Sequence, residues 1–245
     1  MNGRQRLDLA LEARGLLPSR ARARDAVLRG TVKVNGVAAR KPNQMVGADD
    51  AIELDDPAAA YVSRAALKLI AGLDAAGITV EDRVCLDVGA STGGFTQVLL
   101  ERGAKRVYAV DVGHDQLSDR IRRDGKVVVL EGQNARDLTV GEISEPIDLL
   151  VCDVSFVSVT KVLVAPLALC RPGANAVVLV KPQFEVGREK VGGGGIVSDP
   201  EAIAGATAGV VAFMARQGFA YQLSVPSPIA GGDGNRETVT VFRRN

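Results

Sequence analysis

Two charged residues stand where their side chains could do chemistry together. Asp153 directly follows the apolar run 147–152, and Lys181 directly follows the apolar run 176–180. If both runs are strands of one open α/β sheet, the two side chains project to the same rim, outside the carboxyl ends of the strands, where ligands bind. A lysine there can take a proton from an alcohol or steer it. The alternative is a plain Lys181–Asp153 ion pair. A solvated acid is the alternative for both Glu185 and Glu237, and we expect it for Glu185.

A glycine-rich turn, residues 87–96, follows the apolar run 84–86 and precedes an apolar helical pattern. A buried strand, such a turn and a helix start together hold nucleotide-like ligands, because glycines let the backbone approach closely. The spacing differs from G-x-G-x-x-G, and no lysine directly follows the last glycine. The turn therefore fits neither an NAD-dependent oxidoreductase nor a P-loop protein. We expect these residues of the turn to bind the ligand: Asp87, Gly89, Ala90, Ser91, Gly93, Gly94, Phe95 and Thr96.

Two further polar residues suggest that this ligand is a nucleoside. Asp111 ends the next apolar run, 22 residues after Gly89, where an acid can accept hydrogen bonds from a ribose diol. The third run leads to Asn134, whose small polar side chain suits an adenine edge. The alternatives are a helix cap or a solvent-facing acid for Asp111 and a plain turn at Asn134.

The elements that must position these residues form an α/β pattern. The apolar runs predict a sheet in which the first five strands, covered on both faces, are parallel. The last two runs alternate in polarity, as an edge hairpin would, and Glu237 immediately precedes the second of them. A helix is predicted from residue 200 to about 217 after an Asp-Pro cap. The predicted strands are 84–88, 106–110, 127–130, 147–152, 176–180, 221–225 and 238–242.

Before the first of these strands, another helix is predicted to begin at a Ser63 cap. Leu67, Ile70 and Ala71 share its predicted inward stripe. Lys68 then lies at the edge of that stripe, and an ordinary surface lysine is an equally open interpretation.

Most of the positive charge lies in the first 48 residues. They hold 10 Lys and Arg against 3 Asp and Glu, which is +7, whereas residues 49–245 hold 20 against 26, which is −6; the sum is the net +1. Helices are predicted over 4–14 and 20–29, with a hairpin at Asn35-Gly36 and a strand over 51–54. A small α+β module with an arginine-rich helix favours a nucleic-acid partner, although a solvated basic surface is the alternative.

The remaining composition excludes several classes of protein. The three cysteines lie in or beside apolar runs, so we expect reduced core residues and no disulfide framework. The single His114 cannot build a metal cluster, so no metal is expected. No apolar run reaches 18 residues and the N-terminus lacks an apolar signal core, so we expect a cytoplasmic protein without a membrane partner.

Residues 4–54 resemble the S4 RNA-binding domain. The resemblance rests on Arg-Gln-Arg-Leu-Asp at 4–8 and on the segments 15–23 and 30–36. It implies binding to structured RNA, whose phosphates and shape an arginine helix can contact. The residues expected to bind RNA are Arg4, Arg6, Arg20, Arg22, Arg24 and Lys33, with Arg64 from the following segment.

Four further motifs resemble those of the TlyA-type ribosomal RNA 2′-O-methyltransferases, which join an S4 domain to an FtsJ-like domain. They are Tyr-Val-Ser-Arg-x-x-x-Lys-Leu at 61–69, the turn 87–96, Asp-Val-Ser-Phe-Val-Ser at 153–158 and Lys-Pro-Gln-Phe-Glu-Val-Gly at 181–187. The resemblance implies a Rossmann-like class I methyltransferase fold with a seven-stranded, mostly parallel sheet and S-adenosylmethionine as cofactor, with Asp153 also contacting it. It further implies a catalytic tetrad of Lys68, Asp153, Lys181 and Glu237.

The resemblance also implies a substrate, the ribose 2′-hydroxyl of a cytidine in ribosomal RNA or in a ribosomal subunit. Members that act on both subunits tend to carry longer ends, and this chain stops three residues after Phe242, so large-subunit RNA is favoured. Expected domains are 1–55 for the S4 part, 56–62 for a linker and 63–245 for the methyltransferase part. The alternatives are a non-catalytic RNA-binding or ribosome-assembly factor, and a membrane-active haemolysin, because the family also carries that name.

Overall fold

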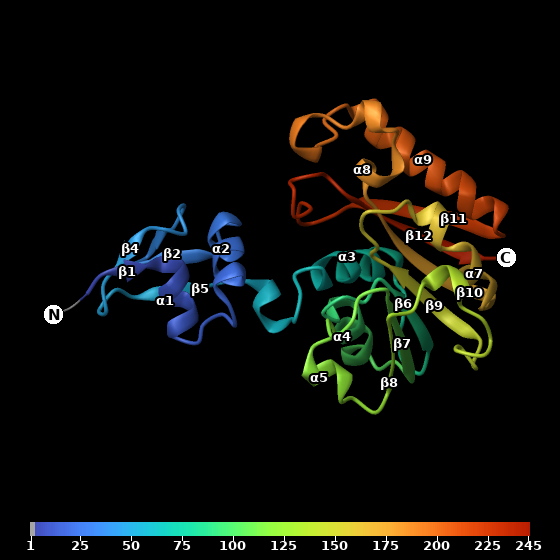
Figure 1. Cartoon of the computed structure of the whole chain (residues 1–245), viewed down its shortest axis with the longest axis horizontal. Coiled ribbons are helices and arrows are strands. Elements are labelled where there is room, and N and C mark those ends of the chain that lie inside the picture. The colour runs from blue at the N-terminus through green and yellow to red at the C-terminus, as the bar shows by residue number, and fades with distance from the viewer. Residues whose placement is uncertain (1–2) are drawn as a thin grey trace. The chain divides into compact units, whose positions relative to one another are not determined.

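The computed structural model describes residues 3–245 of the chain. The chain divides into two compact units between Ala60 and Tyr61 (Figure 1). The predicted linker, residues 56–62, spans this division, and its exact bounds stay a prediction.

The first unit packs two helices against short antiparallel strands. Its core is formed by Leu7, Leu11, Ala23, Val27 and Val32, all at most 1% exposed. The helix predicted from residue 4 is wrong at its start, because residues 5 and 6 pair as a strand with Val46 and Met45. The elements are β1 (Gln5–Arg6), α1 (Leu7–Ala13), α2 (Arg20–Leu28), β2 (Val32–Val34), β3 (Val37–Ala38), β4 (Met45–Val46), β5 (Ile52–Leu54) and the 3₁₀ helix η1 (Pro57–Ala60).

Two local features of this unit follow from its sequence, and the hairpin predicted at Asn35-Gly36 is confirmed. Ser19 caps α2, because its side chain accepts a hydrogen bond from the backbone N–H of Arg22 at 3.3 Å. Asn35 and Gly36 have φ values of 50° and 76°, as the tight turn between β2 and β3 requires.

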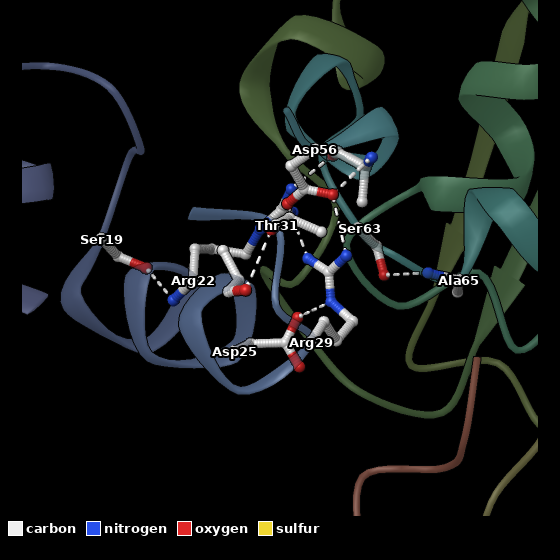
Figure 2. A network of polar contacts seen from close by, with 10 residues as sticks. Ser19, Arg22, Asp25, Arg29, Thr31, Asp56, Ser63 and Ala65 are labelled. Carbon is white, nitrogen blue, oxygen red and sulfur yellow. Dashed lines mark hydrogen bonds and ion pairs between the residues drawn. The ribbon is translucent and has the colours of Figure 1, made fainter. Parts of the chain in front are cut away.

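Asp56 fixes the end of the first unit to α2. Both of its carboxylate oxygens accept from Arg29, at 2.8 and 2.6 Å, and Arg29 also donates to Asp25 at 2.8 Å (Figure 2). Burial opposes ionisation of Asp56, but the hydrogen bonds from Arg29 lower its pKa below the ordinary value. The same carboxylate accepts from the N–H of Ala58 at 2.9 Å, so the start of the predicted linker is held in place.

The second unit is built on one seven-stranded sheet with the order β11-β12-β10-β9-β6-β7-β8. The strands from β10 to β8 are parallel, whereas β12 is antiparallel to both of its neighbours. The predicted seven-stranded, mostly parallel sheet is confirmed, with β11 at its edge. The strands are β6 (Val84–Val88), β7 (Arg106–Asp111), β8 (Val127–Glu131), β9 (Ile147–Cys152), β10 (Cys170–Val180), β11 (Phe219–Pro226) and β12 (Thr238–Arg244).

Helices cover both faces of this sheet (Figure 1), because successive strand residues point to opposite faces. Cys85 and Leu149 belong to a core with α3 and α4, whereas Leu86 and Leu150 belong to a core with α6, α7 and α9. Across residues 3–245, no helix is long and apolar enough to cross a membrane. The helices are α3 (Ala66–Ala76), α4 (Gly94–Glu101), α5 (Asp119–Arg122), α6 (Val159–Val162), α7 (Val164–Ala168), α8 (Pro182–Glu185) and α9 (Pro200–Arg216), with 3₁₀ turns η2 (Ala135–Asp137), η3 (Arg188–Lys190) and η4 (Gly193–Gly195).

Helix α3 differs from its prediction at its start. Its N-cap is Ala65, and Ser63 instead accepts a hydrogen bond from the N–H of Ala65 at 3.2 Å (Figure 2). The predicted cap at Ser63 is therefore wrong.

The predicted inward face of α3 is also wrong, because a different set of its residues faces the core. Leu67, Ile70 and Ala71 are only partly buried, whereas the buried face consists of Ala66, Lys68, Leu69, Gly72 and Leu73. The reason is the close approach of the helix to the sheet at Gly72, where a Cβ atom would lie 2.6 Å from Val239 Cγ1 and 3.0 Å from Val177 Cγ1. This phase turns Lys68 inward and leaves it 6% exposed.

We expect Gly72→Ala to destabilise the protein by about 1–3 kcal/mol, because Val239 and Val177 are stiff, buried strand residues that cannot yield to a new methyl group. Thermal and denaturant unfolding would measure this loss. The matched control is Gly209→Ala on α9, where nothing lies within 4 Å of the new Cβ. It should stabilise by about 0.5–1 kcal/mol through helix propensity. A Gly72→Ala protein as stable as the control would contradict the close-packing argument.

Candidate active site

Asp153 and Lys181 meet at the carboxyl edge of the sheet, as their positions in the sequence predict. Val178 of β10 pairs with Cys152 of β9, so the chain leaves both strands at the same rim. The Nζ atom of Lys181 lies 2.6 Å from Oδ1 of Asp153 and donates to Oγ of Ser155 at 2.7 Å. Lys181 is only 7% exposed, so it is not a surface lysine.

Lys68 and Glu237 form a second ion pair at this rim. The Nζ atom of Lys68 donates to Oε2 of Glu237 at 2.5 Å, and Glu237 is 5% exposed. Val180 of β10 pairs with Thr238 of β12. Lys181 directly follows Val180 and Glu237 directly precedes Thr238, so the two residues lie at the same end of adjacent strands. The four residues of the expected tetrad therefore gather at one edge of the sheet as two buried ion pairs.

The glycine-rich turn has the backbone shape that only its glycines allow. Gly89 has a φ of 86°, and a Cβ atom on it would lie 2.8 Å from the carbonyl oxygen of Asp153. Gly93, with a φ of 96°, is the N-cap of α4. The turn thus approaches the backbone of Asp153 closely and directs the start of α4 toward the rim.

Two adjoining cavities open beside this turn. The larger, of about 560 Å³, and the smaller, of about 140 Å³, share Gly89, Ser91, Asp153 and Ser155, and the smaller one reaches Lys181. A groove of about 970 Å³ between α9 and β11 contains no residue of the turn. The two cavities at the turn are therefore the place for a nucleotide-like ligand.

Asp111 and Asn134 both line the larger cavity. Asp111 accepts one hydrogen bond on each oxygen, from the N–H groups of Ser91 and Gly113, both at 2.8 Å. Each carboxylate oxygen can accept another hydrogen bond, as binding of a ribose diol requires. Asn134 also caps the turn η2, because its side chain accepts from the N–H of Arg136 at 3.1 Å. This donor and acceptor set fits an adenosine moiety.

The predicted turn residues divide into two groups. Ala90, Gly94 and Phe95 join Gly89 and Ser91 in lining the cavities. In contrast, Asp87, Gly93 and Thr96 line neither cavity; they lie within the turn and support its shape, and direct cofactor contact by them stays a prediction.

Asp87 and Thr96 form the buried base of the turn. The hydroxyl of Thr96 donates to Oδ2 of Asp87 at 2.7 Å, and both residues are fully buried. Among the residues that the structure describes, no hydrogen-bond donor reaches Oδ1 of Asp87. Burial raises the pKa of Asp87 from 3.8 to about 7. The hydrogen bond from Thr96 opposes this rise, and the negative charge of Asp153 adds to it by a smaller amount.

Three residues that the sequence did not single out complete the rim. Ser155 binds Lys181, and the motif Asp-Val-Ser directly after β9 was the signal for it. Phe156 is 92% exposed with a φ of 67°, and its ring centroid lies 5.5 Å from that of Phe184. Val112, directly after Asp111, is 69% exposed and lines the larger cavity, where it offers an apolar wall to a base.

Glu185 is not the solvated acid that the sequence predicts. It accepts from the hydroxyl of Ser158 at 2.6 Å and from the N–H of Val159 at 2.8 Å, and thereby joins α8 to the start of α6. Burial raises the pKa of Glu185 above its ordinary value. The carboxylate ties the segment after Lys181 to the segment after Asp153.

The basic residues expected to bind RNA differ in their exposure and in their contacts within the protein. Arg24 and Lys33 are exposed, as is Arg4, whereas Arg64 is half-buried just before α3. Arg6 and Arg20 both bind the buried Asp8, at 2.9 and 3.0 Å. The hydrogen bond from Arg6 lowers the pKa of Asp8 to about 2 against the opposing effect of burial. Arg22 donates to the carbonyl of Ala58 at 2.6 Å.

Comparison with known families places both units. Residues 61–244 match the FtsJ-like methyltransferase family, and residues 5–52 match the S4 domain. A relative named 16S/23S rRNA (cytidine-2′-O)-methyltransferase TlyA, from Mycobacterium tuberculosis, is 44% identical over 97% of this chain and 89% of its own length. Hemolysin A of Brachyspira hyodysenteriae is 40% identical over 97% of this chain and 99% of its own.

Solved structures agree with this placement. A protein from Streptococcus thermophilus, named as a hemolysin, superposes with a TM-score of 0.78 at 37% identity and covers 100% of this chain and 90% of its own. The magnesium protoporphyrin IX methyltransferase of Synechocystis with bound SAM has a TM-score of 0.51 at 13% identity and covers 74% of this chain and 79% of its own. The second likeness shows the class I methyltransferase fold alone.

We expect Asp87→Asn to stabilise the protein at pH 8 and to lose this advantage near pH 4. Because the folded-state pKa of about 7 exceeds the ordinary 3.8, protonated Asp87 favours the fold at low pH, and that contribution is lost as the pH rises from 3.8 through 7. The variant has no buried group to ionise. Its advantage in the free energy of unfolding over the unmodified protein should therefore grow by on the order of 3 kcal/mol between pH 5 and pH 8.

Thermal unfolding without ligand across this pH range would measure the gain. Asp119→Asn is the control, because Asp119 is 80% exposed and its ion pair is with Arg123, an exposed residue directly after α5. A gain for Asp87→Asn that is independent of pH would mean that Asp87 is ionised throughout the range.

Proposed function

The chain belongs to the FtsJ-like methyltransferase family, as a TlyA-type member with an N-terminal S4 domain, and we propose that it methylates the ribose 2′-hydroxyl of a cytidine in ribosomal RNA. The observation that carries this proposal is the pair of buried ion pairs, Lys181–Asp153 and Lys68–Glu237, beside the glycine-rich turn. The printed activity of the TlyA relative supports the choice of substrate.

The cofactor is S-adenosylmethionine, and the two cavities at the turn accommodate its parts. When bound, it supplies an electrophilic methyl group on a sulfonium. We assign Asp111 to the ribose diol and Asn134 to the adenine edge, with Val112 against the face of the base. The smaller cavity, which reaches Lys181, then takes the part of the cofactor next to the reacting methyl group.

Lys181 holds the reacting hydroxyl and steers its proton. A ribose hydroxyl is a weak nucleophile, so its oxygen must lie in line with the methyl carbon and sulfur. It must lose one proton as the new C–O bond forms and the methyl–sulfur bond breaks, which would leave a neutral thioether. Asp153 and Ser155 fix the Lys181 amine at 2.6 and 2.7 Å, which leaves little freedom for its position. We assign Lys181 as the general base or proton-steering group, with Asp153 setting its position.

Lys68 and Glu237 help to position the same hydroxyl. Their 2.5 Å ion pair bridges α3 and the residue before β12, and the same two elements also pack closely at Gly72. Glu237 orients Lys68, and Lys68 helps to hold the hydroxyl at the rim.

Phe156 is the platform for the target base. An apolar ring that is 92% exposed, next to the Ser155 that binds Lys181, suits stacking of an unpaired base. The contact with the ring of Phe184 holds the platform in place. A nucleotide that is turned out of an RNA helix onto Phe156 would bring its ribose to the rim.

The S4 domain supplies the sequence-independent part of RNA binding. We assign phosphate contacts to Arg4, Arg6, Arg20, Arg22, Arg24 and Lys33 in the first unit, and to Arg64 in the second. The buried Asp8 fixes the directions of Arg6 and Arg20. Large-subunit RNA is the favoured substrate, and a relative from Campylobacter jejuni, 38% identical over 80% of this chain, is named for 23S rRNA alone. Ribosomal RNA as substrate implies action in the cytoplasm.

The purified protein should transfer a labelled methyl group from S-adenosylmethionine to large ribosomal subunits that lack the mark, and Lys181→Met should lower turnover by roughly 10²- to 10⁴-fold. The methionine keeps most of the length of the side chain but has no group that can take up or donate a proton. The affinity for the cofactor, measured by calorimetry, should stay near that of the unmodified protein. Parallel reactions with small subunits would test the choice of substrate.

Lys161→Met is the matched control, because Lys161 is an exposed lysine on α6 near the same rim. It should keep normal turnover. Full turnover by Lys181→Met would remove Lys181 from its role, and cofactor binding without transfer to either subunit would favour a non-catalytic RNA-binding factor.

Phe156→Ala should raise the KM for RNA by about tenfold or more, because stacking contributes about 1–3 kcal/mol per base. The KM for S-adenosylmethionine should change little. Phe156→Trp should keep activity, since its ring can also stack, and Val140→Ala is a control at an apolar residue that is 76% exposed. If Phe156→Ala instead weakened cofactor binding alone, the ring would be a cover for the cofactor and not a platform for RNA.

A further inference from the structure

The side chain of Asn235 joins two loops near the catalytic rim. Asn235 is fully buried, and its amide nitrogen donates to the carbonyl of Gly195 at 2.8 Å while its amide oxygen accepts from the N–H of Val197 at 2.9 Å. Both the donor and the acceptor ends of the amide are thus engaged by the backbone of one segment. A buried side chain used in this way acts as a tether.

The tethered segment, residues 192–197, has little structure of its own to hold it. Gly194 and Gly195 have φ values of 76° and 80°, which only glycine adopts readily. Within the segment, the N–H of Gly192 donates to the carbonyl of Ile196 at 2.9 Å, and the N–H of Gly195 donates to the carbonyl of Gly192 at 3.1 Å. Such a glycine-rich segment gains much of its order from outside contacts, and Asn235 supplies two.

The loop that carries Asn235, residues 231–236, reaches the catalytic residues on two sides. Its Asp233 accepts from the side chain of Gln183, two residues after Lys181, at 3.2 Å. At the other end the chain continues into Glu237, the partner of Lys68. A Cβ atom on Gly231 would lie 2.7 Å from Oε1 of Glu237, so the loop also packs against that carboxylate.

We propose that Asn235 is a positioning residue for methyl transfer, which acts through Glu237 by fixing the 231–236 loop to the 192–197 segment. The inference rests on the proposed function. Loss of the tether lets the loop shift, and the carboxylate of Glu237 then no longer holds Lys68 in the place that the reacting hydroxyl requires. Cofactor binding, which uses the turn and the ends of β7 and β8, is left intact.

The experiment compares Asn235→Ala, Asn235→Asp, Glu237→Ala and the double variant Asn235→Ala with Glu237→Ala. Asn235→Asp keeps an acceptor for the N–H of Val197 but places an oxygen against the carbonyl of Gly195. Asn175→Ala is the matched control, because Asn175 is also a structural amide, bound to Arg83 at 2.8 Å, in the part of β10 far from Lys181. The measurements are kcat and KM with large ribosomal subunits, cofactor affinity, thermal midpoint and amide hydrogen exchange at Val197.

Asn235→Ala should lower kcat by roughly 10- to 100-fold with unchanged cofactor affinity, because small displacements of positioning groups are costly to rate. In the Glu237→Ala background the same change should cost less than about twofold, since a residue that acts through another shows no independent effect once that residue is gone. The N–H of Val197 should exchange faster in Asn235→Ala and remain protected in Asn235→Asp, while Asn175→Ala behaves normally in every measurement.

Three results would overturn the inference: an unchanged kcat in Asn235→Ala, an equal loss with and without Glu237, or unchanged exchange at Val197. A fall in cofactor affinity in step with a lower thermal midpoint would also overturn it, because it would indicate general destabilisation. If the unmodified protein transfers no methyl group, the proposed function fails and takes the positioning role with it, whereas the exchange at Val197 still reports on the tether.

Discussion

The structure depends on the burial of two lysines at the carboxyl edge of its sheet. Lys68 and Lys181 are 6% and 7% exposed, and each is paired with one carboxylate. A buried charge without a partner is strongly destabilising, so these pairs persist only if the elements that carry them are held in register. Lys181 follows β10, Glu237 precedes β12, and the pairing of Val180 with Thr238 sets their separation. The same pairing brings both lysines to the edge where we propose that the hydroxyl is held.

The glycine-rich turn lies at the same edge of the sheet and contacts the backbone of Asp153. Gly89 allows the turn to approach the backbone of Asp153, whose side chain pairs with Lys181. Beneath it, the fully buried Asp87 has a pKa raised by burial, which costs stability at neutral pH. Stability lost at a site of chemistry is a common feature of enzymes. The turn and the Lys181–Asp153 ion pair are thus joined by one close backbone contact.

Errors in the predictions made from sequence have specific physical causes. The inward stripe of α3 was predicted from apolar side chains alone, but Gly72, which has no side chain, sets the contact with Val239. Glu185 was expected in solvent because it is charged, yet two hydrogen bonds from α6 keep it partly buried. The start of the first helix was misplaced because residues 5 and 6 pair with a strand about 40 residues away along the chain.

The sequence by itself determined the features that depend on neighbouring residues. Five continuous apolar runs and two alternating runs determined the seven strands, Asn35-Gly36 determined a hairpin, and motif resemblance named Lys68, Asp153, Lys181 and Glu237 together. Only the tertiary structure decided which carboxylate each lysine contacts, since Lys68 and Glu237 are 169 residues apart in the chain. It also decided the partners of Ser155 and Asn235. The physical reason is that turns and periodicity follow from local backbone preferences, whereas burial and pairing of charge follow from contacts that exist only after the sheet has closed around them.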